Sequence, residues 1–208
     1  MTLATSYSVT VPGWVLSEVA DAPLTTDADK MALVNRLARR NFREKTGGPF
    51  AALVVDSLSG ELLAAGVNLV LASGLSASHA EVVALGLAQV KSGHWDLGAG
   101  GAQRELVVNW RPCVQCYGAT MWSGVRRLVI AGEGPELERL THFDEGPMVA
   151  DWVAQFEARG ITVVRDVLRV EALDVFREYG ERVAAGDAVV YNARGAGAID
   201  KGGGATTS

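Results

Sequence analysis

Ser78-His79-Ala80-Glu81 and Arg111-Pro112-Cys113-Val114-Gln115-Cys116 are the two stretches around which this chain is organised. One imidazole and two thiolates are enough to hold a zinc ion, and three protein ligands leave a fourth position for water, as in catalytic zinc sites. We expect each stretch to lie in the first turn of a helix, with Pro112 at the first helical position. Residues i and i+3 share a helix face, so both sulfurs can converge on one ion.

Each element of this pattern has another interpretation when it stands alone. Ser78-x-x-Glu81 is also a capping box, in which Glu81 would return a hydrogen bond to the cap residue. His79 could be an ordinary buried polar residue, and Cys113-x-x-Cys116 could be a redox pair. Their conjunction, with a gap (82 to 111) that fits one helix and one strand, favours the pattern of zinc-dependent base and nucleoside deaminases. In that pattern Glu81 lies near the metal without binding it and moves protons during hydrolysis.

Bulk composition restricts the class of protein. The chain has 208 residues with 49% hydrophobic side chains, ample for one domain with extensions. A net charge of −5 argues against nucleic acid as the main partner, because nucleic-acid-binding proteins usually carry a basic face. Neither a signal peptide nor an apolar run of roughly 20 residues is visible, so we expect a cytoplasmic protein without a membrane span. The two cysteines are too close in sequence for a useful disulfide.

The chain divides into an N-terminal extension (1–25), a catalytic domain (26–185) and a glycine-rich C-terminal tail (186–208). Within the domain, apolar periodicity and breakers predict helices and strands in alternation after an initial helix and hairpin. The expected helices cover residues 26–45, 79–92, 113–123, 135–140, 149–159 and 170–185. The expected strands cover residues 50–56, 61–66, 104–109, 126–131 and 161–165. This order predicts an open α/β layered domain with parallel strands.

The motifs together resemble the cytidine deaminase-like superfamily, and within it the bacterial guanine deaminases, whose neighbours are the tRNA adenosine deaminases. The resemblance covers most of residues 26–165. Besides the two metal stretches, it is carried by Gly47-Gly48-Pro49-Phe50, Gly66-x-Asn68, Gly118-Ala119-x-x-Trp122 and Phe143-Asp144-Glu145. It implies a three-layer α/β/α fold around a mixed five-stranded sheet, a homodimer, and one Zn²⁺ per subunit with a bound water or hydroxide.

The resemblance also implies roles for individual residues. His79, Cys113 and Cys116 would hold the metal, and Glu81 and Glu145 would be the catalytic acids. Asn68 would hydrogen-bond the ring of a bound base and Phe50 would stack on it; Ala80, Trp110 and Asp144 complete the expected base-binding set.

One segment departs from the family pattern. Family members usually have Glu immediately before Pro-Cys, whereas this chain has Asn109-Trp110-Arg111. Arg111 reverses the charge beside the metal and adds a bidentate donor, which would favour a more electron-rich or anionic substrate. Trp110 could either stack on the substrate or fill the core.

The sequence therefore predicts a zinc-dependent hydrolytic deaminase of a free purine-like base, with guanine as the first expectation. Alternatives are deamination of cytosine, a pterin, an aminotriazine or a nucleoside, adenosine editing in tRNA, and a non-catalytic zinc protein of the same fold. The Tyr191-Asn192 segment is a candidate lid over the pocket.

Overall fold

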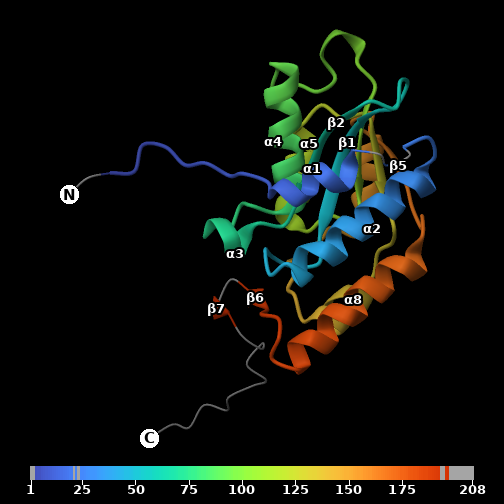
Figure 1. Ribbon diagram of the computed structural model, residues 1–208. Coiled ribbons are helices and arrows are strands. Elements are labelled where there is room, and N and C mark those ends of the chain that lie inside the picture. Colours follow the sequence, from blue (N-terminus) through green and yellow to red (C-terminus); the bar gives the residue numbers. More distant parts are fainter. Residues whose placement is uncertain (1–2, 21, 23, 193–194, 197–208) are drawn as a thin grey trace, which may run out of the picture.

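A mixed five-stranded sheet forms the centre of the molecule in a computed structural model that describes residues 3–20, 22, 24–192 and 195–196 (Figure 1). The strand order is β2-β1-β3-β4-β5. β1 is antiparallel to both β2 and β3, whereas β3, β4 and β5 are parallel to one another. The strands are β1 (Ala51–Asp56), β2 (Leu62–Val67), β3 (Arg104–Val108), β4 (Arg127–Ile130) and β5 (Thr162–Val164). The predicted strands and the mixed sheet are thus confirmed.

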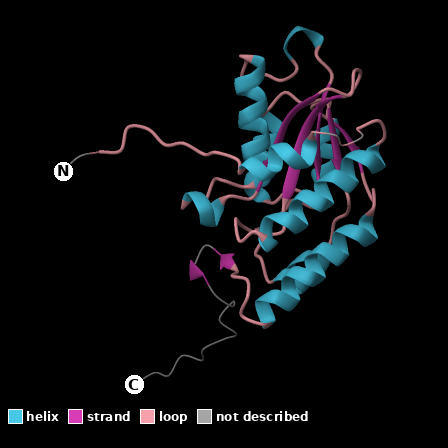
Figure 2. Ribbon diagram, in the orientation of Figure 1, coloured by secondary structure: helices cyan, strands magenta, loops and turns pink. Residues whose placement is uncertain are grey.

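Helices cover both faces of this sheet (Figure 2). The main ones are α2 (Asp27–Arg43), α4 (Ala80–Ser92), α5 (Val114–Trp122) and α8 (Arg169–Ala184). The shorter ones are α1 (Gly13–Val19), α3 (Val70–Ser73), α6 (Glu136–Thr141), α7 (Trp152–Glu157) and the 3₁₀ turn η1 (Ala99–Gly101). A two-stranded ribbon, β6 (Tyr191–Asn192) with β7 (Gly195–Ala196), follows α8.

Alternate residues of the central strands belong to two separate cores. Leu53, Val107 and Val129 pack with α2, α6 and α8 on one face. Val54 and Leu106 pack with α4 and α7 on the other face. Because both faces are covered, these strands contain continuous apolar runs instead of an alternation of apolar and polar residues. This arrangement confirms the three-layer α/β/α architecture.

The first long helix has the predicted start. Thr26 is the N-cap, and its side chain and that of Asp29 form a reciprocal capping box. The cations on its outer face are paired: Arg36 and Arg40 contact Glu18, and Arg39 and Arg43 contact Glu178. The acidic side chains of α1 and α8 therefore neutralise the basic face, which favours its interpretation as a solvated helix surface.

Two local expectations differ from the structure. The segment 68–78, expected to be a loop, contains the short helix α3, which the side chain of Ser73 stabilises by donating to the carbonyl of Leu69. The helix expected over residues 149–159 is reduced to α7, because Gly146, with φ of 71°, and the segment after it run as irregular chain. In the described part of the chain, we find no helix that combines the length and apolarity of a membrane span.

The sheet determines where the functional side chains meet. β3 ends at Val108, beside the start of β1, and the register pairs Ala52 with Val108. β2 also ends at this edge, since Val67 pairs with Ala51. The chain segments that leave β2 and β3 carry the two motif stretches, so α4 and α5 begin at the same edge. In open α/β sheets, the crevice outside the carboxyl ends of the strands is the usual ligand site.

Candidate active site

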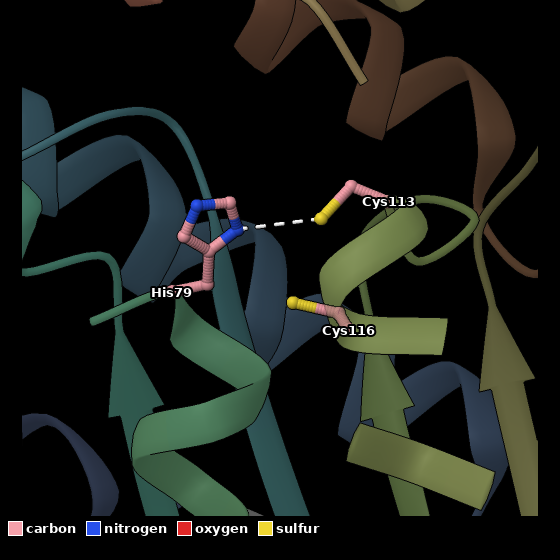
Figure 3. Close-up of side chains that lie close together, drawn as sticks. All are labelled: His79, Cys113 and Cys116. Carbon is pink, nitrogen blue, oxygen red and sulfur yellow. Dashed lines mark hydrogen bonds between the residues drawn. The ribbon is translucent and has the colours of Figure 1, made fainter. Parts of the chain in front are cut away.

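His79, Cys113 and Cys116 converge at the starts of α4 and α5 (Figure 3). Their ligand atoms all lie within 4.8 Å of one another, and Nδ1 of His79 is 3.4 Å from Sγ of Cys113. Cys116 is fully buried and Cys113 is nearly so. The predicted metal ligands are therefore brought together from two helices that are 34 residues apart along the chain at these positions.

This donor set fits zinc. With Zn–S of about 2.3 Å and Zn–N of about 2.0 Å, a tetrahedral ion separates a sulfur from a nitrogen by roughly 3.5 Å, close to the separation of Nδ1 and Sγ here. A hydrogen bond from Cys116 lowers the pKa of the Cys113 thiol to about 4, which makes Cys113 a thiolate ready for a metal. The carboxyl groups of Glu81 and Glu145 both lie close enough to His79 to raise the pKa of its imidazole. This concentration of acidic groups favours a divalent cation.

The helix starts differ in detail from the prediction. His79 and Cys113 are N-cap residues with extended backbone, one position before the first turn, and Pro112 precedes the cap instead of opening the helix. The cap position directs a side chain away from the helix barrel. The imidazole of His79 makes no capping hydrogen bond, so its Nδ1 faces the sulfur of Cys113.

The capping-box interpretation of Ser78 and Glu81 does not hold. The hydroxyl of Ser78 pairs with that of Ser73 at 2.9 Å, and His79 occupies the cap position instead. Glu81 is only 6% exposed and lies, like His79, on the cavity wall. Burial raises the pKa of Glu81, and the nearby Cys113 thiolate acts in the same direction. A carboxyl whose pKa is raised holds a proton more readily than an exposed one, which suits a group that accepts and returns a proton.

Glu145 is a second acid on the wall of the same cavity, and it is half-buried. Burial raises its pKa to about 8, the charges of Cys113 and Glu81 add to the rise, and Arg111 opposes it. Its carbonyl oxygen accepts a hydrogen bond from the N–H of Val114 at 3.1 Å. This contact fixes the Glu145 segment to the start of α5, next to the metal ligands.

A cavity of about 520 Å³ opens over these groups, large enough for a small heterocycle. The predicted residues Phe50, Asn68, Trp110 and Asp144 line it, whereas the side chain of Ala80 is fully buried in the core and stays a prediction as a base-binding residue. The remaining lining residues are Val70, Ser76, Val108, Arg111, Gln115, Phe143, Tyr191 and Asn192.

Trp110 belongs to both the core and the cavity wall. It is 2% exposed and packs edge-on against Phe176, with ring centroids 5.3 Å apart. The guanidinium of Arg169 lies 4.8 Å over the ring of Trp110 and donates to the carbonyl of Glu133. Core filling, one of the two interpretations of Trp110, is therefore correct for most of the side chain. Arg111 is held through its backbone N–H, which donates to the carbonyl of Gly132 at 2.8 Å.

Sequence reasoning missed two buried amides that shape this wall. Asn41 donates to the carbonyls of Gly48 and Asn68, at 2.9 and 2.8 Å. Asn109 accepts from the N–H of Ala51 and donates to the carbonyl of Pro49. A signal existed for Asn41, because it lies between Ala38 and Phe42 on the apolar side of α2, where an amide needs partners.

Two residues of the C-terminal tail reach the site. Tyr191 and Asn192 line the cavity, and Asn192 accepts from the N–H of Asp144 at 3.0 Å and donates to the carbonyl of His142. The closing of this segment as a lid stays a prediction. Positions 193–194 and 197–208, the rest of the predicted lid and tail apart from β7, lie outside the described residues.

Comparison with known proteins gives two informative solved structures and one informative curated relative. Guanine deaminase from Nitrosomonas europaea has a solved structure that is 40% identical, with a TM-score of 0.80 over 87% of this chain and 100% of that chain. A mutant of NE0047 in complex with 8-azaguanine is 41% identical, with a TM-score of 0.80 over 85% of this chain and 98% of that chain. A probable cytosine deaminase of Schizosaccharomyces pombe is 30% identical over 48% of this chain and 56% of its own length.

The family model for the zinc-binding region of cytidine and deoxycytidylate deaminases matches residues 24–132. That range holds α2, the first four strands and all three metal ligands. The matched region and the geometry of the site agree, and the chain belongs to the cytidine and deoxycytidylate deaminase zinc-binding family.

Proposed function

We propose that this protein hydrolyses guanine to xanthine and ammonia. The observation that carries the proposal is the buried carboxyl of Glu81 beside a His-Cys-Cys zinc site, in a cavity sized for a small heterocycle. Support comes from the guanine deaminase of Nitrosomonas europaea, which matches 87% of this chain at 40% identity. The overall reaction consumes one water, forms a carbonyl on the ring carbon and releases the amino group as ammonia.

Metal binding and proton transfer are assigned to different residues. His79, Cys113 and Cys116 would hold zinc, which lowers the pKa of a bound water to about 7 and so supplies the nucleophile that hydrolysis needs. Glu81 accepts one proton from the attacking water and delivers it to the ring nitrogen. It then takes the second proton from the hydroxyl group that has been added to the ring carbon and gives it to the amine, so that the carbonyl forms as the C–N bond breaks and ammonia leaves. Its burial suits this role, because a carboxyl with a raised pKa exchanges protons readily near neutral pH.

The cavity walls support a planar, polar base as the substrate. Phe50 and Trp110 supply apolar surface, and Phe50 is held by Phe143 at 5.4 Å between ring centroids. Asn68 offers an amide for the ring, and Glu145 places a second proton donor or acceptor in the same cavity. The NE0047 mutant binds 8-azaguanine, which is a purine analogue. This complex favours a purine as the ligand of the cavity described here as well.

Cytosine is the second candidate substrate, since the relative from Schizosaccharomyces pombe is a probable cytosine deaminase. The purine proposal has the broader support, because that relative matches only 48% of this chain. Measuring ammonia release over guanine, cytosine, pterins and aminotriazines, each also as its nucleoside where one exists, ranks these substrates directly.

The decisive test compares Glu81→Ala with wild type, at equal zinc content determined by elemental analysis. We expect wild type to release ammonia from guanine and Glu81→Ala to lose at least about 100-fold in kcat, the usual contribution of a positioned acid-base group. Glu61→Ala is the matched control, because Glu61 is solvent-exposed and the only described partner of its carboxylate is the side chain of Lys91. An active Glu81→Ala variant, or a wild type inert toward the whole panel, would contradict the proposal.

We also propose that the protein acts as a homodimer in the cytoplasm. Val90 on α4 and Trp122 on α5 are 80% and 79% exposed, an amount of apolar surface that a second copy would cover. A reducing compartment would keep Cys113 and Cys116 available as metal ligands. Light scattering of wild type and Trp122→Glu tests the dimer: the proposal requires a dimeric wild type and a weakened dimer in the variant.

A further inference from the structure

The side-chain amide of Asn68 is fixed at its oxygen end. Tyr191 donates its phenolic hydrogen to Oδ1 of Asn68 at 2.5 Å, and the N–H of Val70 donates to the same oxygen at 3.2 Å. Asn68 is 2% exposed, and what it exposes faces the cavity that it lines. Among the described residues, no hydrogen bond engages its Nδ2, so the two hydrogens of that nitrogen are what the amide can offer to a ligand.

The reversed amide orientation is disfavoured by both contacts. The backbone N–H of Val70 can only donate, so placing Nδ2 opposite it would set donor against donor. The hydroxyl of Tyr191 has one hydrogen and already accepts from the N–H of Gly48 at 3.0 Å. Its own hydrogen is therefore free to be donated, and Oδ1 of Asn68 is the acceptor within reach.

Packing holds Tyr191 in this position. Its ring meets Phe143 edge-on, with centroids 4.9 Å apart. A Cβ at Gly48 would lie 2.5 Å from the hydroxyl of Tyr191 and 3.2 Å from the ring of Phe143, and a Cβ at Gly47 would lie 2.1 Å from the carbonyl of Asn68. Real Cβ atoms essentially never come within 3.0 Å of another heavy atom, so the two glycines provide the space in which Tyr191 and Asn68 meet.

We propose that Tyr191 is a positioning residue that sets the orientation of the Asn68 amide and thereby part of the substrate specificity. With Tyr191 in place, Asn68 presents N–H donors to the bound base, which selects a ring that offers a lone pair at that position. This inference rests on the proposed function, because it concerns how the same cavity recognises its heterocycle.

The test measures how strongly the protein discriminates against purines that lack one acceptor. The probes are guanine, 3-deazaguanine, 7-deazaguanine and 2-aminopurine, each assayed for ammonia release and for affinity by calorimetry. A site built to donate to a lone pair rejects the analogue that lacks it, and we expect a loss of about 100-fold or more in kcat/KM for one analogue with wild type. In Tyr191→Phe only the longer contact, from the N–H of Val70 at 3.2 Å, still holds Oδ1, and we expect that penalty to fall below about tenfold.

Tyr179→Phe is the matched control. Tyr179 belongs to the same aromatic cluster, stacking on Phe143 with centroids 5.6 Å apart, but its hydroxyl donates to the carbonyl of Val189 and not to Asn68. We expect this variant to keep the wild-type pattern of discrimination. Asn68→Asp, which presents only acceptors at neutral pH, should bind guanine more weakly than wild type.

Either of two results with the variants would overturn the proposal: Tyr191→Phe with the discrimination of wild type, or Tyr179→Phe with the same loss of discrimination as Tyr191→Phe. Calorimetry separates this failure from failure of the proposed function. If wild type releases no ammonia but still binds the probes with a preference that Tyr191→Phe abolishes, the proposed reaction is wrong and the positioning role holds. Equal affinities of wild type for all four probes would refute the positioning role.

Discussion

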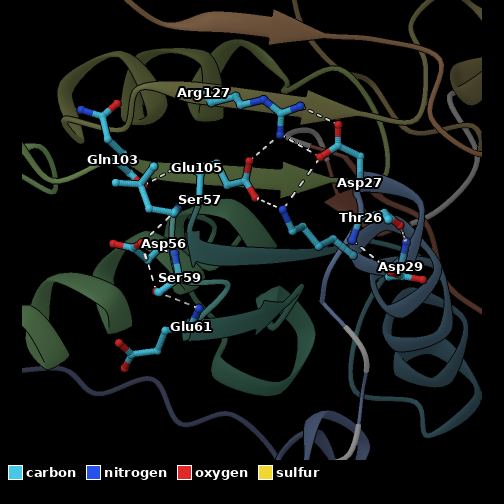
Figure 4. Close-up of polar contacts among 12 residues, drawn as sticks. Thr26, Asp27, Asp29, Asp56, Ser57, Ser59, Glu61, Gln103, Glu105 and Arg127 are labelled. Atoms are coloured by element: carbon cyan, nitrogen blue, oxygen red, sulfur yellow. Dashed lines mark hydrogen bonds and ion pairs between the residues drawn. The ribbon is translucent and has the colours of Figure 1, made fainter.

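Replacing Lys30 by methionine should destabilise the fold without changing catalysis. Glu105, at the start of β3, is fully buried and receives two cations: Nζ of Lys30 at 2.5 Å and the guanidinium of Arg127. Figure 4 shows Arg127 between Glu105 and Asp27. The metal ligands lie beyond the other end of β3. This ion-pair cluster and the cavity are therefore at opposite ends of the strand.

The size of the effect follows from burial. Removing one partner of a buried ion pair costs about 3–5 kcal/mol, because the remaining charge stays desolvated. Arg127 still bonds the second oxygen of Glu105, so we expect a loss of about 3 kcal/mol, near the lower limit of that range. For a domain of this size, each kcal/mol lowers Tm by roughly 2–4 °C, which predicts a decrease of about 6–12 °C.

Lys91→Met is the matched control, since it removes the same charge from a pair with similar geometry. Nζ of Lys91 lies 2.7 Å from Glu61, but the two side chains are 47% and 61% exposed. Exposed pairs contribute about 0–1 kcal/mol. Urea denaturation of the zinc-loaded variants at pH 7 gives the free energy of unfolding, and calorimetry gives Tm. Ammonia release by Lys30→Met and by Lys91→Met at 25 °C should match that of wild type. Equal losses of stability in the two variants would refute the assignment of the effect to burial.

Three further predictions concern the metal, the substrate and pH. Chelation should abolish ammonia release and lower Tm, and Zn²⁺ but not Mg²⁺ should restore both, because thiolate and imidazole ligands favour zinc; full activity after chelation would exclude a catalytic metal. Arg111→Glu should shift the order of kcat/KM among amino-heterocycles, and an unchanged order would remove Arg111 as a specificity residue. The hydrogen bond from Arg127 lowers the pKa of Asp27 in the folded state. The contribution of ionised Asp27 to folding stability is therefore fully present above the pKa of Asp27 in the unfolded chain, and it is lost as the pH falls through the pKa of Asp27 in the folded protein. Thermal denaturation should therefore show that Asp27→Asn lowers Tm more at pH 7 than at pH 3, and an equal decrease at both would contradict this role.

The parts of this protein that could be predicted from its sequence are those whose signal is local. The apolar runs of β1, β3 and β4 and the caps of α2 reflect neighbouring residues, so element positions followed from periodicity. The metal ligands were predictable because zinc chemistry needs few residue types at restricted spacing. The competing capping box at Ser78 failed for a non-local reason: Ser73, brought close by α3, takes its hydroxyl.

Contacts between distant segments left weaker signals. Asn41 was hidden in an ordinary amphipathic helix, although it joins the carbonyls of Gly48 and Asn68. The role of Trp110 could not be assigned from sequence alone. Only the structure shows that its ring lies under the guanidinium of Arg169 and that the same side chain also lines the cavity. A side chain shared between core and site gives no periodic pattern that separates the two roles.

The glycine pair before β1 shows why substrate recognition was the hardest property to predict. Gly47 and Gly48 could be interpreted from sequence only as a helix terminator and a family feature. In the structure, Gly48 lies against the phenol of Tyr191, which is 143 residues further along the chain. A larger side chain at position 48 would collide with that phenol. The same phenol fixes Asn68, so one hydroxyl couples a loop before the first strand, a turn after the second and a ribbon after the last helix. A substitution in any of these three segments should therefore change which base is accepted while leaving His79, Cys113 and Cys116 able to bind zinc, and a zinc-loaded Gly48→Ala variant with altered discrimination would separate recognition from metal binding.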